Sequence, residues 1–217
     1  MTDTLTRSQL LQTRLTGVAF LSLEKPRTAV PTPVQTLNNL LPEGGLVTGS
    51  FVEILSAQEG AGAFSLALTL ARPTLGRREA WAVVDSENTF YPPAAAALGY
   101  DLSRLVLIRP RGDEDAWAFT QLLRSADISV CFWMTARMDS MVFRRLQLAA
   151  EKTEGLGFVM RPAAAERKPC WASARLMASW DDASGGRRLR ARVLHAAGRF
   201  VDSAQEIAVN VNGDAQS

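Results

Sequence analysis

The chain has few of the residues from which metal centres and nucleophilic active sites are built. Its 217 residues include two cysteines, Cys131 and Cys170, and one histidine, His195. The two cysteines show no metal-ligand spacing, and His195 has no evident partner serine or cysteine, so neither a metal site nor a catalytic triad is supported. Cys131 lies in an apolar run and is expected to be a buried thiol, which suits a reducing compartment.

Long apolar runs and a strong net charge are also missing. No apolar run reaches the length of a membrane span, and the first ten residues, MTDTLTRSQL, do not resemble a signal peptide, so we expect a cytoplasmic protein without membrane contact. A formal net charge of +2 is too small to indicate a polyanionic partner unless basic residues cluster. The composition, 47% hydrophobic and 21% charged, is typical of a globular domain.

The proline distribution divides the chain into three predicted regions. Residues 4–23 carry a partial apolar stripe typical of one helix, and the three prolines of EKPRTAVPTP then predict an extended linker. We therefore expect an N-terminal helical arm and linker over 1–30, a core over 31–208 and a flexible tail over 209–217.

Within the predicted core, strand and helix patterns alternate. Nearly continuous apolar strands indicate burial on both faces, and hence a mainly parallel sheet flanked by helices. The C-terminal part changes to alternating patterns around the turn DDASGG, which predicts an antiparallel hairpin. The expected fold class is α/β, with strands at 50–56, 80–86, 104–110, 128–134 and 156–162, helices at 34–41, 63–75, 91–100, 113–126 and 139–153, and hairpin strands at 170–180 and 187–200.

The segment EGAGAFSLALTLA, residues 59–71, lies between a strand and a helix, where many proteins hold ATP phosphates. A working loop has G-x-x-x-x-G-K-[ST], in which the lysine neutralises phosphate and the hydroxyl binds magnesium. Here Ala63 replaces the lysine and Phe64 the hydroxyl residue, and the hydroxyl of Ser65 comes one position late. We expect a degenerate nucleotide loop with no ATP or Mg²⁺ cofactor and no catalytic residue, and a Phe64 side chain that fills the emptied pocket. This loop comprises Ser56, Gly60, Gly62, Ala63, Phe64 and Ser65.

Two strand ends bear on hydrolysis. Asp85 and Glu87 follow strand 80–86, at the edge where open α/β sheets bind ligands. Glu87 would orient a water there, or the acids would only cap the next helix. After strand 128–134 an ATPase carries a metal-orienting aspartate, but this chain has Trp133, Met134 and Thr135. That is a second deficit in metal chemistry.

The clearest cluster of charge lies in the second hairpin strand. Alternation places Arg188, Arg190 and Arg192 on one strand face and apolar residues on the other, with Arg187 and Arg199 nearby. Such a row would contact phosphates of single-stranded DNA or an acidic protein surface. The alternative is the solvated face of an edge strand, where charge deters aggregation.

Three long segments resemble the RecA core. VPTPVQTLNNLLPEGGLVTGSFVEI is similar to its beginning, AWAVVDSENTFYPPAAAALGYDLSRLVLIRP to its next segment, and KPCWASARLMASW with RRLRARVLHAAGRF to its later strands. The resemblance covers about residues 31–205 and places Glu87 at the position of the water-activating glutamate, as a vestigial acid. The chain departs from RecA in its phosphate loop, in the short stretch where RecA has a long DNA-binding loop, and in lacking the RecA C-terminal domain.

A short, degenerate RecA-like chain with FRRLQLAAE after its fourth core strand most resembles the ImuA family, the accessory proteins of damage-inducible mutagenesis cassettes. That resemblance implies a non-enzymatic role in SOS-induced translesion synthesis, with contacts to RecA and an ImuB-like protein and, through them, an error-prone polymerase. The N-terminal helix, through Leu10, Leu11 and Leu15, would bind a partner or fold back on its own core. The alternatives are a SulA-like inhibitor of FtsZ, a weak ATPase using Glu87 and Ser65, and a DNA-binding module alone.

Overall fold

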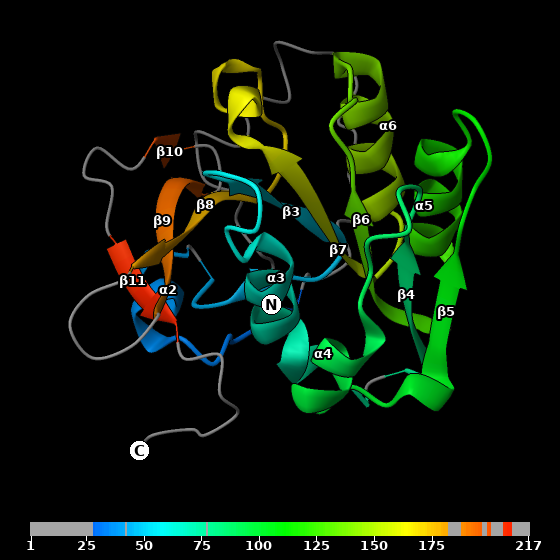
Figure 1. The fold of residues 1–217 in the computed structure, drawn as a ribbon, viewed down its shortest axis with the longest axis horizontal. Helices are drawn as coiled ribbons and strands as arrows, with labels where there is room; N and C mark the ends of the chain where they lie inside the picture. The colour runs from blue at the N-terminus through cyan, green and yellow to red at the C-terminus, as the bar shows by residue number, and fades with distance from the viewer. Residues whose placement is uncertain are drawn as a thin grey trace, which may run out of the picture.

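A nine-stranded mixed sheet forms the centre of the protein (Figure 1). The computed structural model describes residues 28–41, 43–76, 78–181 and 188–196, and the backbone of 199–200 and 206–209. The predicted arm helix, with Leu10, Leu11 and Leu15, lies outside the described residues, as do the tail beyond residue 209, Arg187 and the Arg199 side chain.

The strand order of the sheet is β10-β9-β8-β3-β7-β6-β4-β5, and β11 also pairs with β9. Every neighbouring pair from β5 to β8 is parallel, whereas β9 is antiparallel to β8. The expected α/β class, with a mainly parallel sheet and a C-terminal antiparallel hairpin, is confirmed. The strands are β3 (Ser50–Ser56), β4 (Ala80–Val84), β5 (Leu105–Ile108), β6 (Ile128–Met134), β7 (Leu156–Pro162), β8 (Ala174–Asp181), β9 (Arg188–Ala196), β10 (Arg199–Phe200) and β11 (Glu206–Val209).

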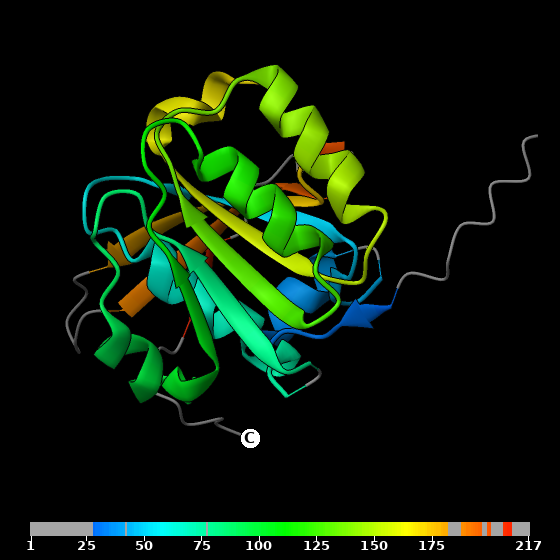
Figure 2. The ribbon, with the colours of Figure 1, turned by 90° about the vertical axis from the view of Figure 1, so that its right-hand side faces the viewer.

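Helices cover both faces of the sheet (Figure 2). On one face α3 (Ala63–Ala71) and α4 (Pro92–Ala97) enclose an apolar cluster with alternate residues of the strands. On the other, α5 (Asp115–Arg124) and α6 (Ser140–Ala150) enclose a second cluster. Burial on both sides explains the continuous apolar strands. The remaining helices are α2 (Gln35–Leu40) and the short 3-10 turns η1 (Arg72–Thr74), η2 (Leu102–Arg104) and η3 (Ala163–Arg167).

Two strands depart from the sequence expectation. The predicted linker contains β1 (Ala29–Val30), which pairs antiparallel with β2 (Leu46–Val47). Gly45 permits this ribbon, because a methyl group there would lie 2.5 Å from the Val30 carbonyl oxygen. The second is β11, which pairs with β9 along residues 189–192. Since β8 lies on its other side, β9 is not an edge strand, and the edge-strand interpretation of the arginine row is wrong.

Candidate interaction site at the carboxyl edge of the sheet

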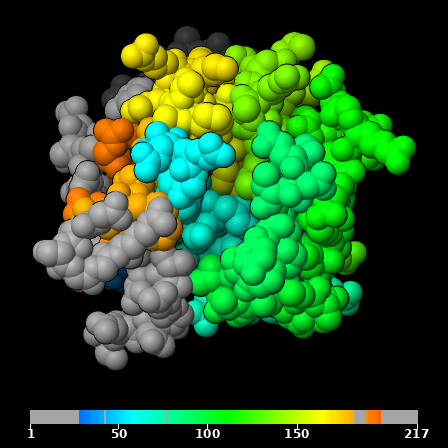
Figure 3. Space-filling model, viewed as in Figure 1, coloured from blue at the N-terminus to red at the C-terminus, as the bar shows by residue number. Residues whose placement is uncertain are grey.

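The glycine loop after β3 is held by the end of the β8–β9 hairpin. Trp180 Nε1 donates a hydrogen bond of 2.7 Å to the Gly60 carbonyl oxygen. Gly62 has φ of +80° at the N-cap of α3, and a methyl group there would lie 2.7 Å from Leu189 Cδ1 and 2.9 Å from Trp180 Cζ2. The hairpin therefore packs directly against the glycine that would begin a phosphate-binding helix. In the space-filling view this loop, in cyan, lies at the surface beside the yellow segment that contains η3 (Figure 3).

The two residues that replace the catalytic lysine and hydroxyl belong to the packing of α3. Ala63 is buried in the apolar cluster of that face. The Phe64 ring packs edge-on against Phe90 and Phe132, at centroid distances of 5.4 and 5.6 Å. Ser65 is half-buried, and its carbonyl accepts a hydrogen bond from Thr69 Oγ1 within the helix. Apolar side chains thus stand where a triphosphate needs cations and a metal ligand.

The acids after β4 lie in different environments. The buried Asp85 accepts hydrogen bonds from the backbone N–H groups of Thr89 (2.9 Å) and Phe90 (3.3 Å). Its other carboxylate oxygen lies 3.5 Å from Arg109 Nε. Asp85 therefore closes the turn that leads to α4. Glu87 is exposed, and the structure gives it no hydrogen bond or ion pair within the described residues.

The arginine row lies on the face of β9 opposite the α3 cluster, as alternation predicts. Leu189, Ala191 and Val193 are buried, whereas Arg188 is exposed and Arg190 and Arg192 are half-exposed. Two of these arginines have acidic partners within the chain: Arg190 pairs with Asp181, and Arg192 Nη2 lies 3.4 Å from Glu166 Oε1. Part of the charge that would attract phosphate or an acidic surface is therefore neutralised locally.

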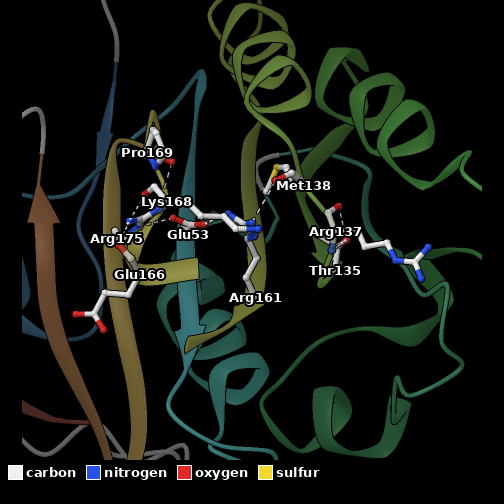
Figure 4. Close-up of polar contacts among 9 residues, drawn as sticks. All are labelled: Glu53, Thr135, Arg137, Met138, Arg161, Glu166, Lys168, Pro169 and Arg175. Atoms are coloured by element: carbon white, nitrogen blue, oxygen red, sulfur yellow. Dashed lines mark hydrogen bonds and ion pairs between the residues drawn. The ribbon is translucent and has the colours of Figure 1, made fainter. Parts of the chain in front are cut away.

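A buried ion cluster crosses the same face beneath η3 (Figure 4). Glu53 Oε1 accepts a hydrogen bond of 2.8 Å from Arg161 Nη1, and Glu53 Oε2 accepts one of 2.5 Å from Arg175 Nε. The side chains are 0%, 1% and 6% exposed respectively, so the ions are removed from water. Arg161 also donates to the Met138 carbonyl, while Arg175 donates to the carbonyls of Glu166 and Lys168. The cluster thereby ties three strands to the loops at their carboxyl ends.

The sequence analysis missed this cluster, although a signal was present. Glu53, Arg161 and Arg175 are lone charges inside the apolar strands SFVEILS, LGFVMRP and SARLMAS. A charge at the centre of a buried strand requires a partner. Which strands are neighbours was not readable from the pattern, because β3 pairs with β7 and β8, more than a hundred residues away.

The two thiols and the histidine do not form a reactive group. Burial raises the pKa of the Cys131 thiol, and burial beside the Glu53 carboxylate raises the pKa of Cys170 to about 12. Burial and the positive charge of Arg175 lower the pKa of His195. Within the described residues, no three His, Cys, Asp or Glu side chains are grouped to hold a metal ion, and no helix is long and apolar enough to cross a membrane.

Sequence comparisons agree with this architecture. The chain is 27% identical over 144 residues to "Protein ImuA" from two strains of Caulobacter vibrioides, in an alignment that covers 61% of this chain and 59% of the relative. The expected relation to ImuA is thereby confirmed as a distant homology, and the chain spans about 59% of the length of these relatives. Residues 39–156 match the family model described as "MT3502 N-terminal domain", a stretch running from α2 to the start of β7. The chain therefore belongs to the MT3502 N-terminal domain family.

Proposed function

We propose that this protein is a non-catalytic adaptor in bacterial damage-induced mutagenesis, contacting RecA and an ImuB-like partner during translesion synthesis. The observation that carries this proposal is the distant homology to Protein ImuA. The error-prone polymerase would be reached indirectly, through the ImuB-like protein. Such an adaptor acts by presenting surface, and it needs no reactive group.

The nucleotide loop supports a role without hydrolysis. Ala63 and Phe64 are part of the α3 packing, and Trp180 and Leu189 cover Gly62 from the hairpin side. A nucleotide would have to displace these contacts and would still find neither the lysine nor the magnesium ligand. Rate acceleration in phosphoryl transfer depends on those charges.

The row of arginines is a candidate contact surface for a protein. Arg188 is exposed, and the half-exposed Arg190 and Arg192 each lie beside a carboxylate, Asp181 and Glu166. Mixed charge at a rim favours specific pairing with another mixed surface, whereas a DNA backbone requires uncompensated positive charge. We therefore propose that the contact is with protein, and single-stranded DNA is the competing outcome.

The deciding experiment is capture with purified partners. Immobilised full-length protein is presented with RecA and, separately, with the ImuB-like protein of the same organism. We expect saturable binding to at least one of them. Absence of binding to both would overturn the proposal. Tight, steeply salt-dependent binding to a single-stranded oligonucleotide that Arg190→Ala weakens would instead assign the row to DNA.

A further inference from the structure

A small pocket opens beside the buried ion cluster, at the carboxyl end of β7. It lies between the start of α6 and the segment 168–171, with a volume of about 260 Å³. Pockets that hold small organic ligands are larger, roughly 300–1,000 Å³. A volume of this size suits one or two side chains from another protein.

Positive charge collects at the base and rim of this pocket. Arg161 forms part of its wall and shares Glu53 with Arg175, so the buried cluster has two guanidinium groups for one carboxylate. The Nε atom of Arg161 is buried without a hydrogen-bond partner among the described residues. Lys168, exposed at the rim, adds a second cation to the lining. A carboxylate seated here would offset the excess charge and supply an acceptor.

The rest of the lining is apolar and partly open to solvent. Trp171 packs against Phe143 with ring centroids 5.5 Å apart, and the Arg161 guanidinium lies 6.0 Å from the centre of the same Phe143 ring. Trp171 keeps 36% of its surface exposed, and Met141, on the first turn of α6, keeps 67%. An exposed tryptophan at the mouth of a cationic pocket is typical of the anchor residues of protein interfaces.

We propose that this pocket docks an acidic segment of a protein partner, taking one aspartate or glutamate beside an apolar side chain. The inference rests on the proposed adaptor function and names the surface that the partner binds. The carboxylate would lie between Lys168 and Arg161, and the apolar neighbour would lie on Trp171. A nucleic-acid backbone fits less well, because Asp139 lies at the rim, where its carboxylate would repel adjacent phosphates.

Two pocket variants and two matched controls test the assignment. Lys168→Glu reverses a rim charge, and Lys152→Glu makes the same change at an exposed position beyond the end of α6. Trp171→Ala removes the aromatic anchor, and Trp117→Ala does so at a 67% exposed site on α5. The dissociation constant for the captured partner, RecA or the ImuB-like protein, is measured for each variant by calorimetry. We expect about a tenfold or greater weakening for both pocket variants and less than about twofold for both controls.

The outcomes separate this inference from the proposed function. If the wild-type chain binds neither partner, the adaptor function fails and the pocket assignment fails with it. If the wild-type chain binds while Lys168→Glu and Trp171→Ala bind equally well, the pocket assignment alone is overturned. Thermal unfolding shows whether Trp171→Ala keeps its fold, and Lys168→Glu, at an exposed position, gives an independent reading. Loss of oligonucleotide binding in these variants, with partner binding intact, would also overturn it.

Discussion

At the scale of single residues, the most unusual feature is Glu53, a buried carboxylate with an arginine on each side. Taking three ions out of water is costly, and the attraction repays that cost only while the geometry and hydrogen bonds are complete. Here the guanidinium groups also donate to loop carbonyls, so losing Glu53 would leave two buried cations facing backbone dipoles alone. The cluster thus makes the loops at the carboxyl edge depend on one side chain.

Glu53→Gln should destabilise the protein strongly. Because the change leaves two arginines buried without an anion, we expect the free energy of unfolding to fall by about 3–5 kcal/mol. Urea denaturation of the full chain measures it. Glu166→Gln, which breaks the half-exposed pair with Arg192, should cost no more than about 1 kcal/mol. Equal losses in the two variants would contradict this account of the buried cluster.

Two glycines of the loop make a matched pair. Gly60 and Gly62 have φ of +69° and +80°, so alanine at either position is strained by about 1–3 kcal/mol. Only at Gly62 would the added methyl group also meet Leu189 and Trp180, whereas at Gly60 nothing lies within 4 Å. We expect Gly62→Ala to lower the free energy of unfolding by at least about 1 kcal/mol more than Gly60→Ala. Urea titrations of the two variants decide it, and a smaller loss for Gly62→Ala would be inconsistent with close packing of the hairpin.

At the scale of elements, the β8–β9 hairpin joins the two ends of the predicted core. Its strand β8 extends the parallel sheet beside β3, and its open end lies over the loop that follows β3. Ala57 N–H also donates to the Ala178 carbonyl, so the loop is attached to β8 at its beginning as well as at Gly60. The hairpin therefore restrains a loop that in a nucleotide-binding protein must admit phosphate.

Trp180→Ala should loosen the loop at residues 57–62. It removes the hydrogen bond to Gly60 and the aromatic edge beside Gly62, and we expect a loss of about 1–2 kcal/mol in stability. Amide hydrogen exchange should rise in the loop and the first turn of α3, and stay near wild type in α5. A uniform rise across the chain would show that the contact serves the whole fold instead of the loop.

At the scale of the whole molecule, burial and charge determine how stability depends on pH. Unfolded thiols ionise near pH 8.5, whereas burial keeps Cys131 and Cys170 protonated in the folded chain, Cys170 up to about pH 12. Because the unfolded state then binds fewer protons, the stabilisation is complete below about pH 8.5 and decreases above it. Burial raises the pKa of Tyr100 above 10 as well, and this extends the decrease.

We therefore expect the free energy of unfolding to fall between about pH 9 and pH 11, by about 1.4 kcal/mol per pH unit for each thiol. Urea titrations across this range measure it. Cys170→Ala, at a half-buried position, should reduce the slope by roughly one thiol's share. An unchanged slope would mean that Cys170 ionises freely in the folded protein.

Nucleotide binding is the other property of the whole molecule that can be tested. With Phe64 packed in the core and Trp180 on the loop, we expect no heat on titrating millimolar ATP with magnesium into the full chain. Ala63→Lys with Phe64→Thr should not restore hydrolysis, because β6 also ends without the metal-orienting acid. A saturable heat with wild type would support the weak-ATPase alternative.

How much was predictable differs from element to element. The sequence patterns predicted the bounds of β3, β6 and β7 correctly, because each is an apolar run bounded by polar residues. The Asp139 cap of α6 followed from its position before an apolar stripe, and its carboxylate accepts the Val142 N–H. In contrast, β1 and β11 are stabilised by pairing with distant strands, so their local sequences carry little signal.

The sequence by itself determined the α/β class, the parallel core and the missing charges of the nucleotide loop, since all three follow from periodicity or from residue identity at one position. Only the tertiary structure decided that Trp180 and Leu189 cover this loop, that Glu53 joins two arginines, and that a cationic pocket opens beside Trp171. The physical reason is that these contacts join residues up to about 120 positions apart in the chain. Hydrophobic periodicity reports which side of a strand is buried, and it does not report which strand lies next to it.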